Sequence, residues 1–328
     1  MLKAGITTYN DMYFFEDAAA ISTKAMGMRA VLGAGILDFP SASAKSTDEY
    51  LKNAERFTKD WKGDELITPS IAPHAAYTCS PETLTKAKRL AEKYGVLLHI
   101  HLSETEWEVG EIKVRYRKRP AEHLDAIGFL DRNVLAVHCI WMDDNEIDLL
   151  AKRKVGVSHC MESNLKLASG FAPVVTMLAA GIKVTLGTDG AASNNDLNIL
   201  SEMSTTAKVH KALSNDPTVV DARTALLMAT RWGAEVLGLG DVTGSLERGK
   251  AADLVVINLE KPHLTPIYDV YSHIVYSVRA SDVETVIVGG RIVINNGRLH
   301  IADEAEIMAK AKKWGERIRG ACTGLQSL

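Results

Sequence analysis

The sequence has 328 residues, of which 46% are hydrophobic and 24% charged, with a formal net charge of −3. This length suits one large α/β domain with or without an appendage, and the composition is ordinary for a soluble globular protein. The small net charge argues against nucleic acid or a membrane surface as a partner, and no apolar run is long enough to span a bilayer.

Cysteine usage and the first residues of the chain indicate the compartment. The four cysteines contain no C-x-x-C pair, so neither a disulfide framework nor a cysteine-based zinc site is expected; they are Cys79, Cys139, Cys160 and Cys322. The segment Met1–Asn10 lacks the basic and apolar regions of a secretory signal. We therefore expect a cytoplasmic protein.

Short β-rich runs alternate with helical patterns along the first 189 residues. The predicted strands are Gly5–Asn10, Arg29–Ile36, Leu66–Pro73, Val96–Leu102, Val134–Trp141, Val155–Cys160 and Lys183–Asp189. The predicted helices between them include Thr47–Trp61, Pro81–Tyr94, Asp143–Arg153 and Pro173–Ala180. Because the strands are almost continuously apolar and alternate with helices, they predict a parallel sheet covered on both faces.

The placement of polar residues favours a closed barrel over an open sheet. Candidate functional side chains lie at or just after the carboxyl ends of the predicted strands: His74, His101, Glu104, His138, His159 and Asp189. In a (β/α)8 barrel these ends converge on one mouth, where active sites lie. Only seven strand–helix units are present, so we predict an α/β fold of the TIM-barrel type that lacks one strand in this chain.

The pattern changes after Asp189. Helices are predicted over Leu197–His210 and Thr218–Leu237, followed by short strands with Gly-Gly and Asn-Gly turns, which predict part of a small antiparallel β domain. A charged helix is predicted over Asp303–Gly320. The expected organisation is a barrel over residues 1–240, the small β domain over 241–300 and a terminal helix over 301–328.

The segment HIHLSE offers the clearest candidate chemistry. His101 ends a predicted strand and can offer its imidazole to a metal, and Glu104 lies three residues further on, where it can move a proton. The alternative is a hydrogen-bonded histidine beside an ordinary surface glutamate. His99 faces the same side one layer deeper. A packed core histidine is the preferred interpretation of His99, and a second ligand is the alternative.

The other strand ends are ambiguous one by one. His138 fits a hydrogen-bonded core histidine, Asp189 a turn or helix cap, and His74 a residue beside a helix start. His159 and Asn164 close the sixth of the predicted barrel strands, and Asn164 either binds substrate or holds its loop. Together, three histidines and two acids at successive strand ends fit one zinc site with its acid–base groups.

Several motifs together resemble the 5-methylthioadenosine/S-adenosylhomocysteine deaminase group of the amidohydrolase superfamily. The matching segments are GITTYNDMYFF, APHAAYTCS, HIHLSET, VHC, SHCMESNLKLASG, LGTDGAASNN and ERGKAADLVVINL. They extend through nearly the whole chain, and HIHLSET with LGTDGAASNN is the most specific combination. Cys160-Met161 stands where the group usually has Asn-Pro.

This resemblance implies roles for five residues. His101 looks like the metal-binding histidine of the fifth barrel strand, and Asp189 like the metal-binding, proton-accepting aspartate of the eighth. Glu104 resembles the glutamate that hydrogen-bonds the purine and protonates its ring, His138 the histidine beside the activated water, and His74 a substrate-contacting histidine. The implied reaction is hydrolytic deamination at C6 of an adenosine-type nucleoside, with one divalent metal: zinc first, iron or manganese as alternatives.

The group also has a His-x-His on its first barrel strand, and that strand would precede GITTYN. We therefore favour an impaired fragment of a longer deaminase. The alternatives are an active chain in which His99 or another residue replaces those ligands, and a non-catalytic subunit, with a homo-oligomer allowed. Among enzymes, guanine deamination or triazine hydrolysis is the alternative reaction, because one barrel serves many chemistries.

Overall fold

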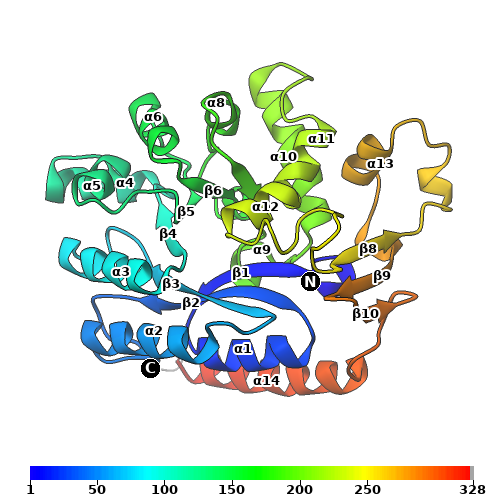
Figure 1. Ribbon diagram of the computed structural model, residues 1–328, viewed down its shortest axis with the longest axis horizontal. Coiled ribbons are helices and arrows are strands. Elements are labelled where there is room, and N and C mark those ends of the chain that lie inside the picture. The colour runs from blue at the N-terminus through cyan, green and yellow to red at the C-terminus, as the bar shows by residue number, and fades with distance from the viewer. Residues whose placement is uncertain (326–328) are drawn as a thin grey trace.

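Seven parallel strands form the main sheet, each beside its neighbour in sequence, in the order β1 to β7. The computed structural model describes residues 1–325, with side chains through Gly320. The strands are β1 (Thr8–Tyr13), β2 (Arg29–Ile36), β3 (Ile67–Pro73), β4 (Leu98–Leu102), β5 (Val134–His138), β6 (Gly156–His159) and β7 (Val184–Leu186). The sheet curls into part of a barrel wall (Figure 1). The predicted fold class and the seven strands are confirmed.

Helices follow the strands, and most of them cover the outside of the curled sheet, whereas α9 lies within its curve (Figure 1). They are α1 (Glu16–Ala25), α2 (Thr47–Trp61), α3 (Pro81–Tyr94), α4 (Glu106–Tyr116), α5 (Pro120–Ala126), α6 (Asp144–Arg153), α7 (Met161–Lys166), α8 (Val174–Ala179), α9 (Ala191–Asn194), α10 (Ile199–Ser214), α11 (Ala222–Ala229) and α12 (Arg231–Val236). The bounds of α2 and α3 agree with prediction. Helix α3 shows why: Ser80 caps it, Pro81 opens it and Gly95 ends it with φ of 64°.

The clearest departures from prediction concern the first strand and one long helix. The first strand begins at Thr8 rather than Gly5, because Gly5 has φ of 79° and ends a 3-10 turn over Leu2–Ala4. The single helix predicted over Thr218–Leu237 is instead α11 and α12. They are separated at Thr230, whose backbone angles of −130° and −93° are not helical.

A four-stranded antiparallel sheet follows the barrel, as predicted, in the order β11-β10-β9-β8. Its strands are β8 (Leu254–Ile257), β9 (Val283–Val288), β10 (Arg291–Asn295) and β11 (Arg298–Leu299). The turn between β9 and β10 uses Gly289 and Gly290, both with positive φ. Between β8 and β9 lies α13 (Val270–Tyr276), which was not predicted and packs on α10 and α11.

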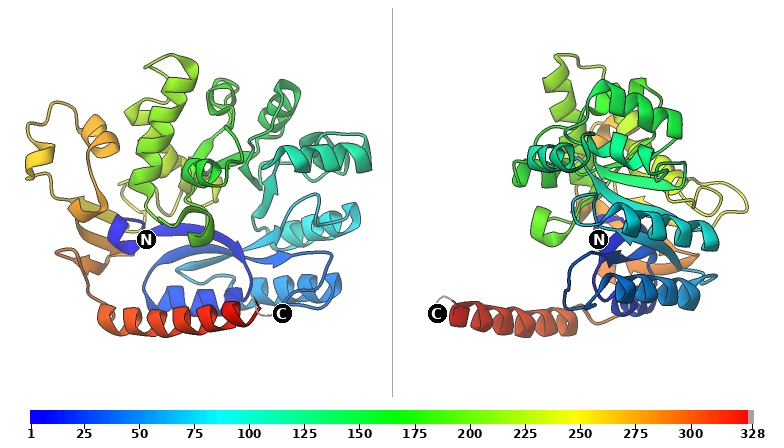
Figure 2. Two further views of the ribbon diagram at one scale, coloured as in Figure 1. Left: turned by 180° about the vertical axis from the view of Figure 1, so that it is seen from behind. Right: turned by 90° about the vertical axis from the view of Figure 1, so that its left-hand side faces the viewer.

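The last helix, α14 (Glu304–Leu325), continues five residues beyond its predicted end at Gly320. It runs below α1 and extends away from the body (Figure 2), and Lys3 and Glu304 form an ion pair of 2.8 Å near its start. None of the helices within residues 1–325 is long and apolar enough to cross a membrane.

A buried ion pair joins the barrel to the small sheet. The Arg29 side chain at the start of β2 donates to Asp253 beside β8 at 2.8 Å, and the two side chains are 6% and 0% exposed. Arg29 also donates to the Glu65 carbonyl, and Asp253 accepts from the backbone of Gly289. With these partners both charges are satisfied, so the pair fixes how the two sheets meet.

Removing one partner of this buried pair should therefore lower the free energy of unfolding far more than breaking an ion pair on the surface. We expect Asp253→Ala to lower the free energy of unfolding by about 3–5 kcal/mol, because it leaves Arg29 buried and uncompensated. Urea denaturation measures this loss. The control is Asp125→Ala, which breaks the exposed pair with Arg153 and should cost below about 1 kcal/mol. Equal losses in the two variants would contradict the assigned role.

Candidate active site

Three neighbouring strand ends bring together several of the side chains that the sequence singled out. His74 follows β3, His101 lies in β4, and His138 ends β5. The ring centroids of His74 and His101 are 4.9 Å apart, and those of His101 and His138 are 5.5 Å apart. Glu104 Oε2 lies 3.7 Å from His138 Nε2. The mouth thus holds a row of imidazoles with a carboxyl group at one end.

Each imidazole of the row is held by its Nδ1 atom. His101 Nδ1 lies 3.0 Å from the His74 carbonyl oxygen, which can only accept a hydrogen bond, so Nδ1 donates and Nε2 keeps its lone pair. His138 Nδ1 lies 3.0 Å from Asn164 Oδ1, and His74 Nδ1 lies 2.9 Å from Thr78 Oγ1. Asn164 thus contacts the His138 ring, and its two predicted roles, substrate binding or loop holding, both stay predictions.

Burial keeps these rings neutral. It lowers the pKa of His101, and the neighbouring His138 lowers it further. It also lowers the pKa of His138, and that of His74 to about 4. A neutral imidazole is the form that binds a metal or accepts a proton.

Glu104 sits on a turn that a second glutamate stabilises. Ser103 has φ of 50°, and the Glu108 carboxylate accepts hydrogen bonds from the backbone N–H groups of Ser103 at 3.0 Å and Glu104 at 2.9 Å. Burial raises the pKa of Glu104, His101 opposes the rise and Asp189 adds to it. Sequence reasoning missed Glu108, although the capping spacing Thr105-x-x-Glu108 was visible.

Asp189 is held in a left-handed backbone conformation after β7, with φ of 59°. Its Oδ2 accepts from Ser163 Oγ at 2.6 Å. The loop is anchored further by Asn194, whose side-chain nitrogen donates to the Thr188 carbonyl and to Glu202. His138 also has a left-handed backbone, with φ of 73°. Such strain in non-glycine residues gathers at functional sites. Positive φ at His138 and Cys139 ends β5 at His138, before the predicted Trp141. Strand β7 ends at Leu186, before its predicted end at Asp189.

Two further histidines lie beneath the mouth. His99 is buried and its Nδ1 lies 3.1 Å from the side-chain nitrogen of Asn10 on β1. His159 is buried against His210 of α10, with the two Nε2 atoms 3.2 Å apart. These contacts are typical of histidines packed in a core. A packed core histidine was the preferred interpretation of His99.

The site offers part of a metal-binding set. His101 presents an unprotonated Nε2 backed by a carbonyl, and Asp189 presents a carboxylate backed by a hydroxyl, which are the supporting contacts that metal ligands have. Nitrogen and oxygen donors of this kind fit a divalent metal. Within residues 1–325, however, no group of three His, Cys, Asp or Glu side chains is arranged to hold an ion. His101 and Asp189 are donors of the kind that a divalent metal takes, and they supply two of them.

Two carboxyl groups, Asp11 in β1 and Glu16 at the start of α1, are close enough to affect each other. Burial raises the pKa of Asp11, and Asp189 adds to the rise. Burial raises the pKa of Glu16 to about 8, with a further contribution from Asp11. Glu16 Oε1 accepts from the backbone of Tyr13 at 2.8 Å, while its Oε2 is buried without a partner in the described residues. Glu16 is therefore protonated at neutral pH.

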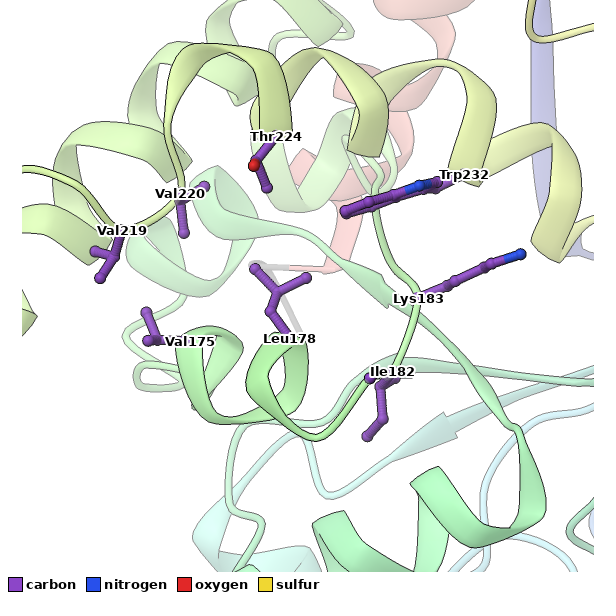
Figure 3. Close-up of a pocket in the computed structure, with 9 residues that line it drawn as sticks. Val175, Leu178, Ile182, Lys183, Val219, Val220, Thr224 and Trp232 are labelled. Carbon is purple, nitrogen blue, oxygen red and sulfur yellow. The ribbon is translucent and has the colours of Figure 1, made fainter.

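A pocket of about 460 Å³ lies elsewhere, at the amino end of β7 (Figure 3). It is lined by Val175, Leu178, Gly181, Ile182, Lys183, Val219, Val220, Thr224 and Trp232. Its walls are mostly apolar, and its one charged side chain, Lys183, is paired with Glu235 at 2.6 Å. The groups capable of acid–base chemistry are at the opposite, carboxyl end of the strands.

A curled parallel sheet with histidines and carboxyl groups at its carboxyl rim is the architecture of a barrel enzyme. The chain belongs to the amidohydrolase family, whose model matches residues 1–293. A relative from Thermodesulfovibrio yellowstonii, named 5-methylthioadenosine/S-adenosylhomocysteine deaminase, is 56% identical over 98% of this chain and 73% of its own length. A Methanosarcina acetivorans protein named 5'-deoxyadenosine deaminase is 45% identical over 97% of this chain and 73% of its own.

A solved structure shares the fold closely. The adenosine deaminase from Xanthomonas campestris with bound zinc superposes with a TM-score of 0.96 at 41% identity, covering 97% of this chain and 73% of that one. The predicted membership in the amidohydrolase superfamily is confirmed.

The raised pKa of Glu16 predicts a pH-dependent stability. The folded protein holds the Glu16 proton up to about pH 8, whereas an ordinary glutamate loses it near 4.5. The uncharged Glu16 therefore leaves the fold at its full stability below pH 4.5, and this stability is lost progressively as the pH rises to about 8. Glu16→Gln cannot ionise, so its free energy of unfolding relative to wild type should increase between pH 5 and pH 8.5.

Urea denaturation across that range measures the difference. Glu82→Gln is the control, since Glu82 is exposed in the first turn of α3, and its stability should parallel wild type. A Glu16→Gln curve that also parallels wild type would refute a protonated Glu16.

Proposed function

We propose that this chain hydrolyses the exocyclic amine of an adenosine-type nucleoside, yielding the inosine derivative and ammonia. The candidate substrates are S-adenosylhomocysteine, 5′-methylthioadenosine, 5′-deoxyadenosine and adenosine. The observation that carries the proposal is a carboxyl group with a raised pKa, Glu104, next to the neutral imidazole of His138. The names of the relatives support the same reaction.

The described residues can donate and accept the protons that this reaction requires. Water adds its oxygen to C6 of the adenine ring, and the bond from C6 to the amine nitrogen breaks. Glu104, whose pKa burial raises, donates a proton to the ring nitrogen beside C6. Asp189 takes one proton from the attacking water and passes it to the departing ammonia. The second water proton leaves the C6 hydroxyl as the C6 carbonyl forms and returns to Glu104.

The histidines orient the reacting groups. His138 is neutral and faces Glu104 with Nε2, so it can accept a hydrogen bond from the attacking water. His74 lies beside His101 on the β3 side, where it contacts the nucleoside in this proposal. Its low pKa, about 4, means that it contacts substrate as a neutral group.

One divalent metal completes the proposed site, with zinc preferred and iron or manganese as alternatives. His101 and Asp189 would hold it, and when bound it would supply Lewis-acid activation of water. In this proposal the protein acts in the cytoplasm on a small molecule. Guanine deamination and triazine hydrolysis are less well supported, because relatives at 56% and 45% identity carry adenosine-type names.

Replacing the two acids tests the acid–base assignment. We expect Glu104→Gln and Asp189→Asn each to lower kcat for ammonia release from 5′-methylthioadenosine about 10²–10⁴-fold, because each removes a proton-transfer step. An enzyme-coupled ammonia assay measures the rates. Glu106→Gln is the matched control, since Glu106 is exposed two residues from Glu104, and it should retain wild-type activity. Unchanged rates in Glu104→Gln would remove Glu104 from the reaction.

Metal removal tests the cofactor. We expect a chelator to abolish ammonia release and zinc to restore it, because His101 and Asp189 are proposed ligands. Metal content per chain, measured by plasma mass spectrometry, should be lower in His101→Ala than in wild type, whereas His99→Ala should retain metal because His99 contacts Asn10 beneath the mouth. Activity that survives complete metal removal would contradict the proposed cofactor.

A further inference from the structure

Helix α7 carries two buried side chains that contact the reacting groups of the mouth. Ser163 Oγ donates to Asp189 Oδ2 at 2.6 Å, and Asn164 Oδ1 lies 3.0 Å from His138 Nδ1. The helix has only six residues, and a helix this short is not stable by itself. Its position therefore depends on the elements that pack against it.

Helix α10 holds the first turn of α7 through two glutamates. The carboxyl group of Glu202, on α10, accepts from the backbone N–H of Glu162, on α7, with distances of 3.3 Å to Oε1 and 3.4 Å to Oε2. In return, Glu162 Oε1 accepts from the hydroxyl groups of Ser201 at 2.6 Å and Thr205 at 2.7 Å. The two helices are thus joined in both directions.

The same carboxyl group of Glu202 also holds the loop that carries Asp189. Asn194 Nδ2 donates to Glu202 Oε1 at 3.1 Å and to the carbonyl oxygen of Thr188, the residue before Asp189, at 2.8 Å. Glu202 is 0% exposed, so these hydrogen bonds are shielded from bulk water. One buried side chain therefore links α10, the first turn of α7 and the loop after β7.

Glu202 acts at this junction as a hydrogen-bond acceptor rather than as a charge. Burial raises the pKa of Glu202 to about 8, and the nearby Glu162 adds to the rise, so the carboxyl group is uncharged at neutral pH. Its Oε1 atom accepts from both the Asn194 side chain and the Glu162 backbone. A single amide oxygen at the same place can therefore replace it.

We propose that Glu202 is a positioning residue of the active site, which places Asp189 and His138 for proton transfer through its hydrogen bonds to α7 and Asn194. The inference rests on the proposed function, because that function assigns Asp189 and His138 to the reaction. Glu202 acts through its neighbours rather than by touching the reacting atoms.

The first test compares kcat and KM for ammonia release from 5′-methylthioadenosine in wild type, Glu202→Ala and Glu202→Gln. We expect Glu202→Ala to lower kcat about 10–10²-fold and to change KM less than about threefold, because a misplacement of about 1 Å in a reacting group slows the chemical step. Glu202→Gln should recover most of the loss, because its amide oxygen can accept both hydrogen bonds. A kcat in Glu202→Ala equal to that of wild type would overturn the proposal.

A double-mutant cycle tests whether Glu202 acts through α7. Ser163→Ala removes the hydrogen bond to Asp189 directly. If Glu202 places Ser163, the double variant Glu202→Ala/Ser163→Ala should lose clearly less kcat than the product of the two single losses, since residues that act as a unit are not additive. Losses that multiply would overturn the proposed route through α7.

Glu146→Ala is the matched control, because Glu146 is also a fully buried glutamate that holds a short helix. Its Oε1 accepts from the backbone of Ala121, in the first turn of α5, at 3.0 Å. We expect the free energy of unfolding, measured in urea, to fall in both alanine variants, because each leaves buried donors without an acceptor. The kcat of Glu146→Ala should stay near that of wild type. Equal losses of kcat in the two variants would reduce the role of Glu202 to stability.

Hydrogen–deuterium exchange gives a readout that needs neither turnover nor metal. In Glu202→Ala the backbone amides of residues 161–167 should exchange faster than in wild type, whereas those of α5 should not, because only α7 loses a supporting contact. Unchanged exchange in α7 would overturn its placement by Glu202. Faster exchange in a protein whose wild type releases no ammonia from any of the four nucleosides would refute the proposed reaction and retain Glu202 as the residue that holds α7.

Discussion

One carbonyl oxygen, that of His74, sets both the strand pairing and the histidine orientation at the carboxyl rim of the sheet. The His74 carbonyl accepts two hydrogen bonds from His101, one from its backbone nitrogen at 2.9 Å and one from Nδ1 at 3.0 Å. The first bond continues the pairing of β3 with β4 past the end of the regular ladder. The second fixes the tautomer of His101, so that its Nε2 lone pair is available to a ligand. Strand pairing and site chemistry are therefore set by the same acceptor, and a shift of either strand would disturb both.

The strand ends around that carbonyl are strained in a consistent way. Ser103, His138 and Asp189 all have positive φ, which costs a non-glycine residue free energy. The cost is offset locally: Glu108 binds the turn at Ser103, Asn164 binds the His138 ring, and Ser163 binds the Asp189 carboxylate. Each bent strand end thus turns a side chain toward the mouth and has its own hydrogen-bonded support.

The strand count and the candidate residues could be predicted from sequence because both depend on local patterns. Apolar runs predict parallel strands, and polar residues after them predict the rim, which is how His101, Glu104 and His138 were found together. The supporting residues were harder, because they act across the fold. Asn164 is 26 residues from His138, and no periodicity indicates that contact. The break at Thr230 and the unpredicted α13 arise from tertiary packing, which a propensity pattern does not contain.

The electrostatics of the mouth explain why burial matters to the proposed chemistry. Burial lowers the pKa of the histidines and raises that of Glu104, so the cluster carries little positive charge of its own. A divalent cation held by His101 and Asp189 would pull the pKa of Glu104 downward. Burial opposes that pull. The turn that keeps Glu104 partly desolvated is held by the hydrogen bonds that the backbone N–H groups of Ser103 and Glu104 donate to Glu108.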